Sequence, residues 1–330
     1  MRSARLSLAL ETGALELPAR GSIAVYRPRV GDDLSALPRD RVVVLTGFKP
    51  DHDHFAASHS VTPSAPYAAA IVCLPRSREA ARALIAQAAA EVAPGGWIAV
   101  DGQKTDGIDT ALKDLRGRVD LSESLSKAHG KLASFQAGAD LSDWRATPHQ
   151  VEGFQTLPGI FSADGPDPGS ILLAAALPAK LGGKIADLGA GWGFLAAEIL
   201  KRPGVKKLDL VEAEADALDC ARVNVADPRA RFHWADATSW RPETLLDAVV
   251  MNPPFHTGRA ADPALGAAFI RAARRMLAPD GSLWLVANRH LPYDAVLSDC
   301  FLEVRDVAGG SGFRVIQAIK PRRDALRAKS

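Results

Sequence analysis

The amino-acid sequence predicts an α/β protein made of two tandem domains, each with a mostly parallel sheet. Two observations predict this fold class. The chain has 330 residues, of which 47% are hydrophobic, which is long for one compact domain and enough for two cores. Short apolar strand patterns also alternate with helical patterns, briefly before a break in the middle of the chain and more clearly after it.

The break lies between about Ala133 and Gly169, where apolar periodicity stops and Gly, Pro, Asp and Ser become frequent. This composition predicts a linker followed by an ordered loop. We therefore expect one domain over residues 1–145 and a second domain over residues 146–330.

The second half predicts a seven-stranded sheet, because strand–helix alternation with short connections is typical of parallel strands covered on both faces. The glycine-rich connection 309–312 is so short that the last two strands must form a terminal antiparallel hairpin. The predicted strands are Lys184–Leu188, Lys207–Val211, Arg231–Trp234, Ala248–Met251, Ser282–Ala287, Phe301–Val307 and Phe313–Ile319. The predicted helices are Ile171–Leu177, Phe194–Leu200, Asp216–Asn224 and Gly266–Leu277.

Composition excludes few partners, because 40 basic and 38 acidic residues leave a net charge of only +2. The cysteines Cys73, Cys220 and Cys300 are far apart and have no metal-ligand spacing with histidines. We therefore expect buried thiols in a reducing compartment and no metal site. The N-terminal segment is too polar for a signal peptide, and no apolar run reaches membrane-spanning length, which predicts a cytoplasmic protein.

A faint internal repeat relates the two halves. The strand over 70–75 and the helix Ser77–Val92 resemble the strand over 248–253 and the helix that follows it. This alignment places Leu74 opposite Asn252. We interpret the N-terminal half as a degenerate copy that lacks a cofactor loop and a catalytic polar residue. The alternative is the general similarity of any two αβ units.

A glycine-rich turn, Asp187-Leu-Gly189-Ala-Gly191-Trp-Gly193, follows the first strand of the second half and opens a helix. Glycines at such a turn let the backbone approach a ligand closely. The acid Asp187 just before the turn strengthens the prediction of a cofactor site. A dinucleotide-binding turn would require glycine where this sequence has Phe194, so a cofactor without a pyrophosphate is favoured over NAD.

Two further acids stand at strand ends. Glu212 follows the next strand, where a carboxylate can accept hydrogen bonds from both ribose hydroxyls of a nucleoside cofactor. Asp236, followed by Ala237, comes after the third strand and can hold an adenine amino group. In this order, these positions favour S-adenosylmethionine, which contains a nucleoside and no phosphate.

The most specific motif is Asn252-Pro253-Pro254-Phe255, directly after the fourth strand. Proline removes an amide donor and fixes the backbone, so the loop presents carbonyl oxygens that are not consumed locally. The Asn252 side-chain oxygen and the Pro253 carbonyl can accept both hydrogens of an sp² amino group, and Phe255 can stack on the planar group. Because the lone pair of such an amine is delocalised, positioning and hydrogen bonding supply the catalysis.

The loop alone admits adenine N6, guanine N2, cytosine N4 and the side-chain amide of glutamine. Together with the segments 156–170 and Val286–Tyr293, however, it resembles the bacterial 16S ribosomal RNA guanine-N2 methyltransferases of the C class. The resemblance runs from about Gln155 to Lys320. The N-terminal half is similar to the degenerate methyltransferase-like domain of that family, although about the first 60 residues match poorly.

This resemblance implies two tandem Rossmann-like methyltransferase domains, with catalysis in the second and RNA recognition or structural support from the first. It implies methyl transfer from S-adenosylmethionine to the N2 amine of a guanine in ribosomal RNA, with 16S RNA favoured. The implied cofactor contacts are Phe161, Gly169, Ser170, Asp187, Gly189, Gly191, Gly193, Glu212, Asp236, Ala237 and Asn252. The implied catalytic residues are Asn252, Pro253 and Phe255, and the implied substrate contacts are Pro254, Phe255, Leu291 and Tyr293, of which Tyr293 is expected to pack.

The expected partner is ribosomal RNA or the small ribosomal subunit, with no membrane or metal, and the protein is expected to be a monomer. A guanine in folded RNA must leave its stack to reach such a pocket. Basic side chains either contact RNA phosphate or form a solvated face. They are Arg271, Arg274, Arg275, Lys320, Arg322, Arg323, Arg327 and Lys329.

Two other functions fit parts of the sequence. A glutamine-N5 or adenine-N6 methyltransferase could use the same Asn-Pro-Pro-Phe loop, but the duplicated first half and the segment 161–170 argue against it. A non-catalytic RNA-binding or ribosome assembly factor is a second alternative. The intact set of Asp187, Glu212 and Asn252 argues against a loss of activity.

Overall fold

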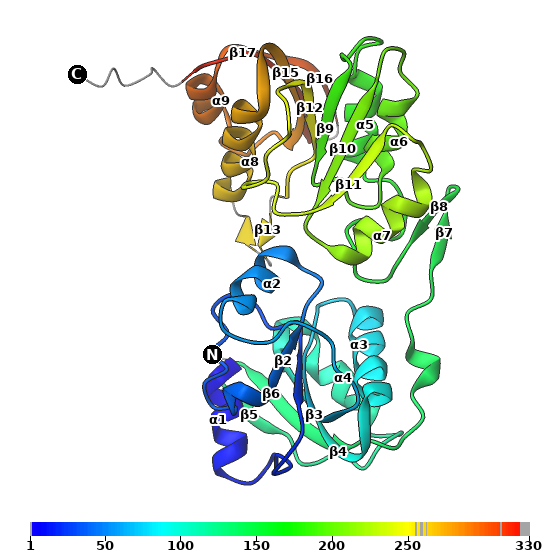
Figure 1. Cartoon of the computed structure of the whole chain (residues 1–330), viewed down its shortest axis with the longest axis vertical. Coiled ribbons are helices and arrows are strands. Elements are labelled where there is room, and N and C mark those ends of the chain that lie inside the picture. Colours follow the sequence, from blue (N-terminus) through cyan, green and yellow to red (C-terminus); the bar gives the residue numbers. More distant parts are fainter. Residues whose placement is uncertain (1, 255, 258–259, 262, 311, 324–330) are drawn as a thin grey trace, which may run out of the picture. The chain divides into compact units, whose positions relative to one another are not determined.

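The computed structural model describes residues 2–254, 256–257, 260–261, 263–310 and 312–323, and the chain divides into two compact units (Figure 1). The first unit comprises residues 1–149 and 157–159. The second comprises residues 150–156 and residues 160 onwards. Each unit contains one sheet of five or more strands.

The sheet of the second unit has seven strands in the order β11-β10-β9-β12-β15-β17-β16. The first five run parallel, and β17 is antiparallel to both β15 and β16, which confirms the predicted fold class. In chain order the strands are β9 (Lys184–Leu188), β10 (Lys207–Glu212), β11 (Ala230–Trp234), β12 (Leu246–Met251), β15 (Leu277–Asn288), β16 (Phe301–Gly310) and β17 (Phe313–Pro321).

Helices cover both faces of this sheet. One face packs against α8 (Pro263–Met276) and α9 (Asp294–Cys300), and the other packs against α5 (Pro168–Ala176), α6 (Phe194–Leu200) and α7 (Ala215–Asn224). Neighbouring side chains of a strand point to opposite faces. In β9, for example, Ile185 packs on the α5–α7 face and Ala186 on the α8–α9 face. Because β9, β10 and β12 are parallel, their last residues lie at the same edge of the sheet.

The first unit has a six-stranded sheet in the order β2-β1-β3-β4-β6-β5. Its strands are β1 (Ile23–Tyr26), β2 (Val42–Leu45), β3 (Tyr67–Cys73), β4 (Val92–Gln103), β5 (Leu125–Lys127) and β6 (Gly130–Gln136). Its α-helices are α1 (Arg2–Glu11), α2 (Lys49–Ala56), α3 (Arg78–Glu91) and α4 (Ile108–Leu115). Shorter elements are the 3₁₀ turns Arg39–Arg41, Lys104–Asp106 and Ser142–Trp144, and the ribbons β7 (His149–Val151) with β8 (Phe154–Thr156) and β13 (His256–Thr257) with β14 (Ala260–Ala261).

The two sheets share one topology, apart from β11, which has no counterpart in the first sheet. In each, four or five parallel strands are followed by an antiparallel pair. β4 and β15 both contain 12 residues with the same succession of buried and exposed positions. Val92 opposes Tyr67 as Leu277 opposes Leu246, and both pairings skip residues after this point. The repeat detected in the sequence therefore corresponds to a duplicated sheet.

The strand register corrects one detail of the repeat. Ala69 opposes Trp97 in the first unit as Ala248 opposes Ser282 in the second. Counting along both strands from this point, the residue that matches Asn252 is Cys73, one position before the expected Leu74. The sequence alignment was wrong by one residue because apolar strands carry no marker of register. Cys73 and Leu74 are both buried, and neither has a side-chain amide. The first unit therefore lacks the side-chain acceptor of Asn252 in either alignment.

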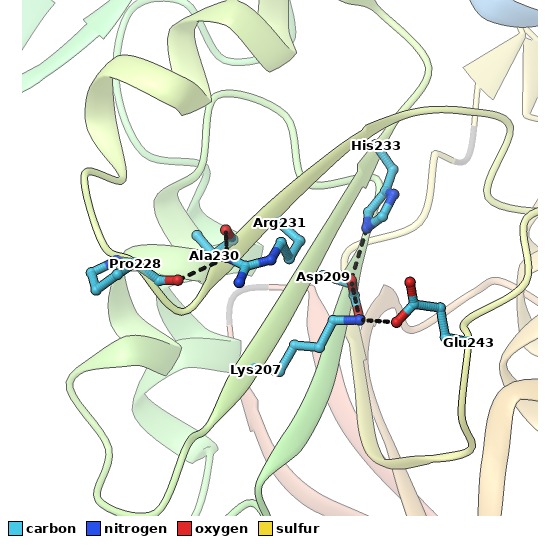
Figure 2. A network of polar contacts seen from close by, with 7 residues as sticks. All are labelled: Lys207, Asp209, Pro228, Ala230, Arg231, His233 and Glu243. Atoms are coloured by element: carbon cyan, nitrogen blue, oxygen red, sulfur yellow. Dashed lines mark hydrogen bonds and ion pairs between the residues drawn. The ribbon is translucent and has the colours of Figure 1, made fainter.

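Several buried polar groups outside the glycine-loop region are paired. Asp209 of β10 is 1% exposed, and its Oδ1 lies 2.8 Å from Nε2 of His233 and 3.5 Å from Nζ of Lys207 (Figure 2). In the first unit, the fully buried Arg5 donates through Nε to Asp101 at 2.6 Å. His233 thus serves as a partner for a buried carboxylate.

The three cysteines are buried and unoxidised, as predicted. The described residues contain no group of three or more His, Cys, Asp or Glu side chains placed to hold a metal ion. Across the same part of the chain, no helix combines the length and the apolar character needed to cross a membrane.

Candidate active site

The glycine-rich turn connects β9 to α6 at the carboxyl edge of the second sheet. Gly189, Gly191 and Gly193 all have positive φ, between 55° and 94°, a region that other residues rarely adopt. A side chain at Gly193 would place its Cβ 2.8 Å from Val225. The amide of Gly189 donates to the carbonyl of Val211 at 2.8 Å. The turn is therefore held tightly against the end of β10.

Asp187 lies on β9 just before this turn and is fully buried. Neither oxygen of its carboxyl group has a hydrogen-bond partner among the described residues. Burial, and after it the charge of Glu212, raises the pKa of Asp187 to about 8. A buried carboxyl group without a partner is unfavourable, and a cationic ligand in the turn would relieve it.

Glu212 ends β10, and its carboxylate makes two hydrogen bonds to backbone amides. Its Oε2 accepts from the amide of Gly191 and its Oε1 from the amide of Glu214, each at 2.8 Å. Burial raises the pKa of Glu212. The carboxylate therefore fixes the backbone of the glycine turn, a role that the strand pattern did not reveal. Its contact with the ribose of a cofactor stays a prediction.

Asp236 and Ala237 follow β11 in a short turn. Oδ1 of Asp236 accepts from both the amide and the hydroxyl of Thr238, at 2.8 and 2.7 Å, while Ala237 is buried. The assignment of both to the adenine end of the cofactor stays a prediction.

The segment from Phe161 to Ser170 lies against the glycine turn through a residue that sequence reasoning missed. The indole Nε1 of Trp192 donates to the carbonyl oxygens of Phe161 and Ser162, at 3.1 and 3.2 Å. Trp192 is buried, whereas the side chain of Phe161 is 58% exposed. The aromatic residue between two turn glycines was the available signal. The backbone of Phe161 is thus held against the turn, while its side chain is largely exposed.

A second missed residue, Asn224 at the end of α7, connects the turn to β8. Its Nδ2 donates to the carbonyl oxygens of Gln155 and Trp192, both at 2.8 Å, and its Oδ1 accepts from the amide of Gln155 at 2.7 Å. This single amide therefore joins the strand before the loop, the glycine turn and α7.

Asn252 follows β12 and meets the N-terminus of α5. Its Nδ2 donates to Oδ2 of Asp167 at 2.8 Å and to Oγ of Ser170 at 2.9 Å. Both hydrogens of the side-chain amide are thereby used, so its oxygen is the group left for an external donor. Asp167 was not among the predicted site residues, although Asp-Pro before an apolar run is a typical start of a helix.

The other residues predicted to contact the substrate differ in their burial. Pro253 is buried and Pro254 exposed, while Phe255 lies outside the described residues. Leu291 and Tyr293 are 3% and 1% exposed and pack in the core beneath α8. This placement agrees with the expectation that Tyr293 packs, and the assignment of both residues as base contacts stays a prediction.

Several of the basic side chains proposed to contact phosphate are engaged within the protein. Arg274 donates to the carbonyl of Arg322, Arg275 to that of Thr238 and Arg323 to that of Leu277, at 2.9 to 3.0 Å. Lys320 pairs with Glu303. Arg327 and Lys329 lie outside the described residues.

The first unit has none of the side chains that define this site. The strand registers make Tyr26 the match of Leu188 and Leu45 the match of Val211. Counting from these pairs, the matching positions are Val25 for Asp187, Arg27 for Gly189, Thr46 for Glu212 and Cys73 for Asn252. The carboxylates, the first turn glycine and the amide are therefore confined to the second unit.

Comparison with known proteins agrees with this geometry. A family profile described as the methyltransferase small domain matches residues 152–317. Ribosomal RNA small subunit methyltransferase C of Pseudomonas aeruginosa (strain LESB58) is 33% identical over 268 residues, which cover 78% of this chain and 80% of its own. The protein of the same name from Hahella chejuensis is 31% identical over 259 residues, with 75% and 76% covered.

A solved structure has the same fold over most of the chain. It is a T. thermophilus 16S rRNA N2 methyltransferase (RsmC) in complex with AdoMet and guanosine, with a TM-score of 0.78 and 24% identity. The match covers 92% of this chain and 90% of that one, so both units are included.

Proposed function

Since this chain belongs to the family of ribosomal RNA small subunit methyltransferase C, we propose that it methylates the exocyclic N2 amine of a guanine in 16S ribosomal RNA. Family membership confirms the resemblance found in the sequence and makes the protein a methyltransferase that uses S-adenosylmethionine. The base, the atom and the RNA are the proposal. Action on ribosomal RNA would place the protein in the cytoplasm.

The observation that carries the proposal is the side chain of Asn252, whose amide nitrogen is fully occupied by Asp167 and Ser170. The group left at the end of β12 is a hydrogen-bond acceptor. A substrate that donates from an amino group suits this acceptor, whereas a carbonyl or a carboxylate would meet it unfavourably.

The residues around the glycine turn fit the cofactor. Asp187 offers a buried carboxyl group that lacks a partner, and Glu212 offers a carboxylate at the strand end. When bound, S-adenosylmethionine supplies an electrophilic methyl group and a positive charge. Asp187 would stabilise a cationic ligand, Glu212 would hold its ribose, and Gly189 and Gly191 leave room for it.

Activation of the amine falls to the loop after β12. The N2 lone pair of guanine is delocalised into the ring, so the free amine is a poor nucleophile. Hydrogen bonds from its two N–H groups to Oδ1 of Asn252 and to the carbonyl of Pro253 favour a pyramidal nitrogen, whose lone pair would form the new N–C bond as the bond between the methyl group and the donor sulfur breaks. The nitrogen then releases one proton to solvent, because neither acceptor oxygen is basic enough to retain it.

The first unit is proposed to support RNA recognition or the structure of the protein without catalysing the reaction. Its positions Val25, Thr46 and Cys73 replace the acids and the amide of the second unit. A guanine in folded RNA must be swung out of its stack to enter the site, at a cost of a few kcal/mol, so contacts with the surrounding RNA are needed to compensate for this cost.

The test uses the purified full-length chain, a tritiated methyl donor, and 16S RNA or small subunits from cells that lack the enzyme. After digestion to nucleosides, label in N2-methylguanosine supports the proposal. Label in N6-methyladenosine or in a glutamine side chain would identify one of the alternative methyltransferases. Cofactor binding measured by calorimetry, without transfer to any RNA, would contradict the proposed substrate and favour an assembly factor.

A further inference from the structure

The side-chain amide of Asn252 can adopt two orientations that differ by exchange of its nitrogen and oxygen. One orientation presents an acceptor to the substrate, and the other presents a donor. Only the first can accept a hydrogen bond from an amino group. The orientation of this amide therefore determines which kind of substrate atom the loop can engage, and some other group must determine the orientation.

The two partners of the amide nitrogen differ in this respect. Ser170 is a hydroxyl group, which can donate or accept and therefore tolerates both orientations. Asp167, when ionised, is an acceptor only, and its Oδ2 lies 2.8 Å from Nδ2 of Asn252. Exchange of the amide atoms would bring two oxygens together at this distance. Asp167 is thus the partner that discriminates between the two orientations.

Asp167 is itself held in place at the start of α5. The same Oδ2 accepts from the amide of Ser170 at 2.9 Å, which caps the helix, and Pro168 occupies the first helical position. Gly169 completes the arrangement, because a Cβ there would lie 2.9 Å from Oδ2 of Asp167 and 3.2 Å from the ring of Phe313. The carboxylate has little freedom to move away from Asn252.

We propose that Asp167 is a positioning residue that locks the Asn252 amide with its oxygen toward the substrate and so makes the site selective for an amine. This inference deepens the proposed function and rests on it. It assigns to Asp167 no contact with the cofactor or with the RNA. Its effect passes through Asn252 alone.

Two variants separate this role from helix capping. Asp167→Ser keeps a good N-cap residue for α5, but its side chain is too short to reach Asn252 while it caps. Asp167→Asn keeps the shape and removes the charge, so its oxygen can still accept from Asn252. We expect kcat for methyl transfer to fall by about 10- to 100-fold in Asp167→Ser, in line with other supporting residues around active sites, and by less in Asp167→Asn.

A matched control is Asp247→Ser, the same substitution at the other end of β12. The Asp247 carboxylate accepts from the amides of Gly183 and Lys184, at 2.7 and 2.9 Å, so a comparable pair of hydrogen bonds is lost far from Asn252. For Asp247→Ser we expect an unchanged kcat. For Asp167→Ser we expect a cofactor Kd and an RNA KM within about twofold of wild type, because the change acts on the chemical step.

The decisive readout is a double-mutant cycle for kcat with Asn252→Ala. If Asp167 acts through the amide, Asp167→Ser has no further effect once Asn252 is alanine. An equal fall in both backgrounds, or an unchanged kcat in Asp167→Ser alone, would overturn the inference. Failure of the proposed function is a separate result: in that case the wild-type protein itself forms no N2-methylguanosine.

Discussion

Asp187 and Glu212 lie at the ends of the neighbouring parallel strands β9 and β10, where burial raises the pKa of both carboxyl groups. Burial, with a contribution from the charge of Glu212, raises the pKa of Asp187 to about 8. Without a ligand, Asp187 therefore remains mostly protonated at neutral pH. A site built in this way is prepared to receive positive charge.

The raised pKa of Asp187 predicts a pH dependence of stability. Between the ordinary value of 3.8 and about 8 the folded chain retains a proton that the unfolded chain has lost. The contribution of this group to the free energy of unfolding is thus largest at acid pH and falls as pH rises through this window, by at most about 1.4 kcal/mol per unit. Asp187→Asn lacks the titration, so its free energy of unfolding relative to wild type should rise from pH 5 to pH 8. Urea denaturation at both pH values measures the difference, and a constant difference would exclude the shift.

Replacement of Glu212 tests the cofactor site. Glu212→Gln loses the charge and one of the two acceptors that hold the amides of Gly191 and Glu214. We expect S-adenosylmethionine to bind more weakly by about 1.5–3 kcal/mol, measured by calorimetry. Glu243→Gln, which removes an exposed partner of Lys207 at the other end of β10, is the matched control and should bind normally. Normal binding by a folded Glu212→Gln would remove Glu212 from the site.

The duplicated topology predicts a single cofactor site per chain. The first unit has Arg27 where the turn begins with Gly189, and Thr46 where β10 ends in Glu212. A calorimetric titration of the full chain should therefore give a stoichiometry of one. A second site, or one site that survives in a Glu212→Gln and Asp187→Asn double variant with wild-type affinity, would mean that the first unit binds the cofactor.

The packing of Tyr293 beneath α8 gives a prediction about stability. A Cβ at Gly266 would lie 1.9 Å from the hydroxyl oxygen of Tyr293, and the buried ring has nowhere to move. Gly266→Ala should lower the free energy of unfolding by about 1–3 kcal/mol through overpacking. Gly117→Ala adds the same methyl group where no atom lies within 4 Å and should change stability by about 0.5 kcal/mol or less. Equal effects of the two substitutions would argue against tight packing.

Much of the second unit could be predicted from local patterns. β9 and α6 have the predicted bounds because glycine marks both boundaries: Gly189 follows the apolar run of β9, and Gly193 precedes the first residue of α6. α9 was missed because its seven residues contain two aspartates and are too short for a clear helical period. β6 extends into the predicted linker. Its sequence did not indicate this, because the strand is defined by its antiparallel pairing with β4, which is a tertiary feature.

Residues of the candidate site could be predicted only where a polar side chain stands at the end of a strand. Asp187, Glu212 and Asn252 each come directly at the end of a parallel strand, and such ends meet at one edge of a sheet. The contact between Asp167 and Asn252 joins residues 85 positions apart and depends on how α5 packs beside β12. The indole of Trp192 likewise reaches a loop 30 residues away. No local pattern encodes either contact.

The most direct test of the central claim compares wild type with Asn252→Ala in the rate of N2-methylguanosine formation in 16S RNA, quantified by mass spectrometry of the digested nucleosides. The role proposed for Asn252 is to accept from the amine, and its implied contact with the cofactor is expected to add little affinity, so S-adenosylmethionine should bind the variant with nearly wild-type affinity. We expect the rate of N2-methylguanosine formation to fall by about 10²- to 10³-fold, because the lost acceptor stabilises the transition state. A variant that forms N2-methylguanosine at close to the wild-type rate would contradict the account.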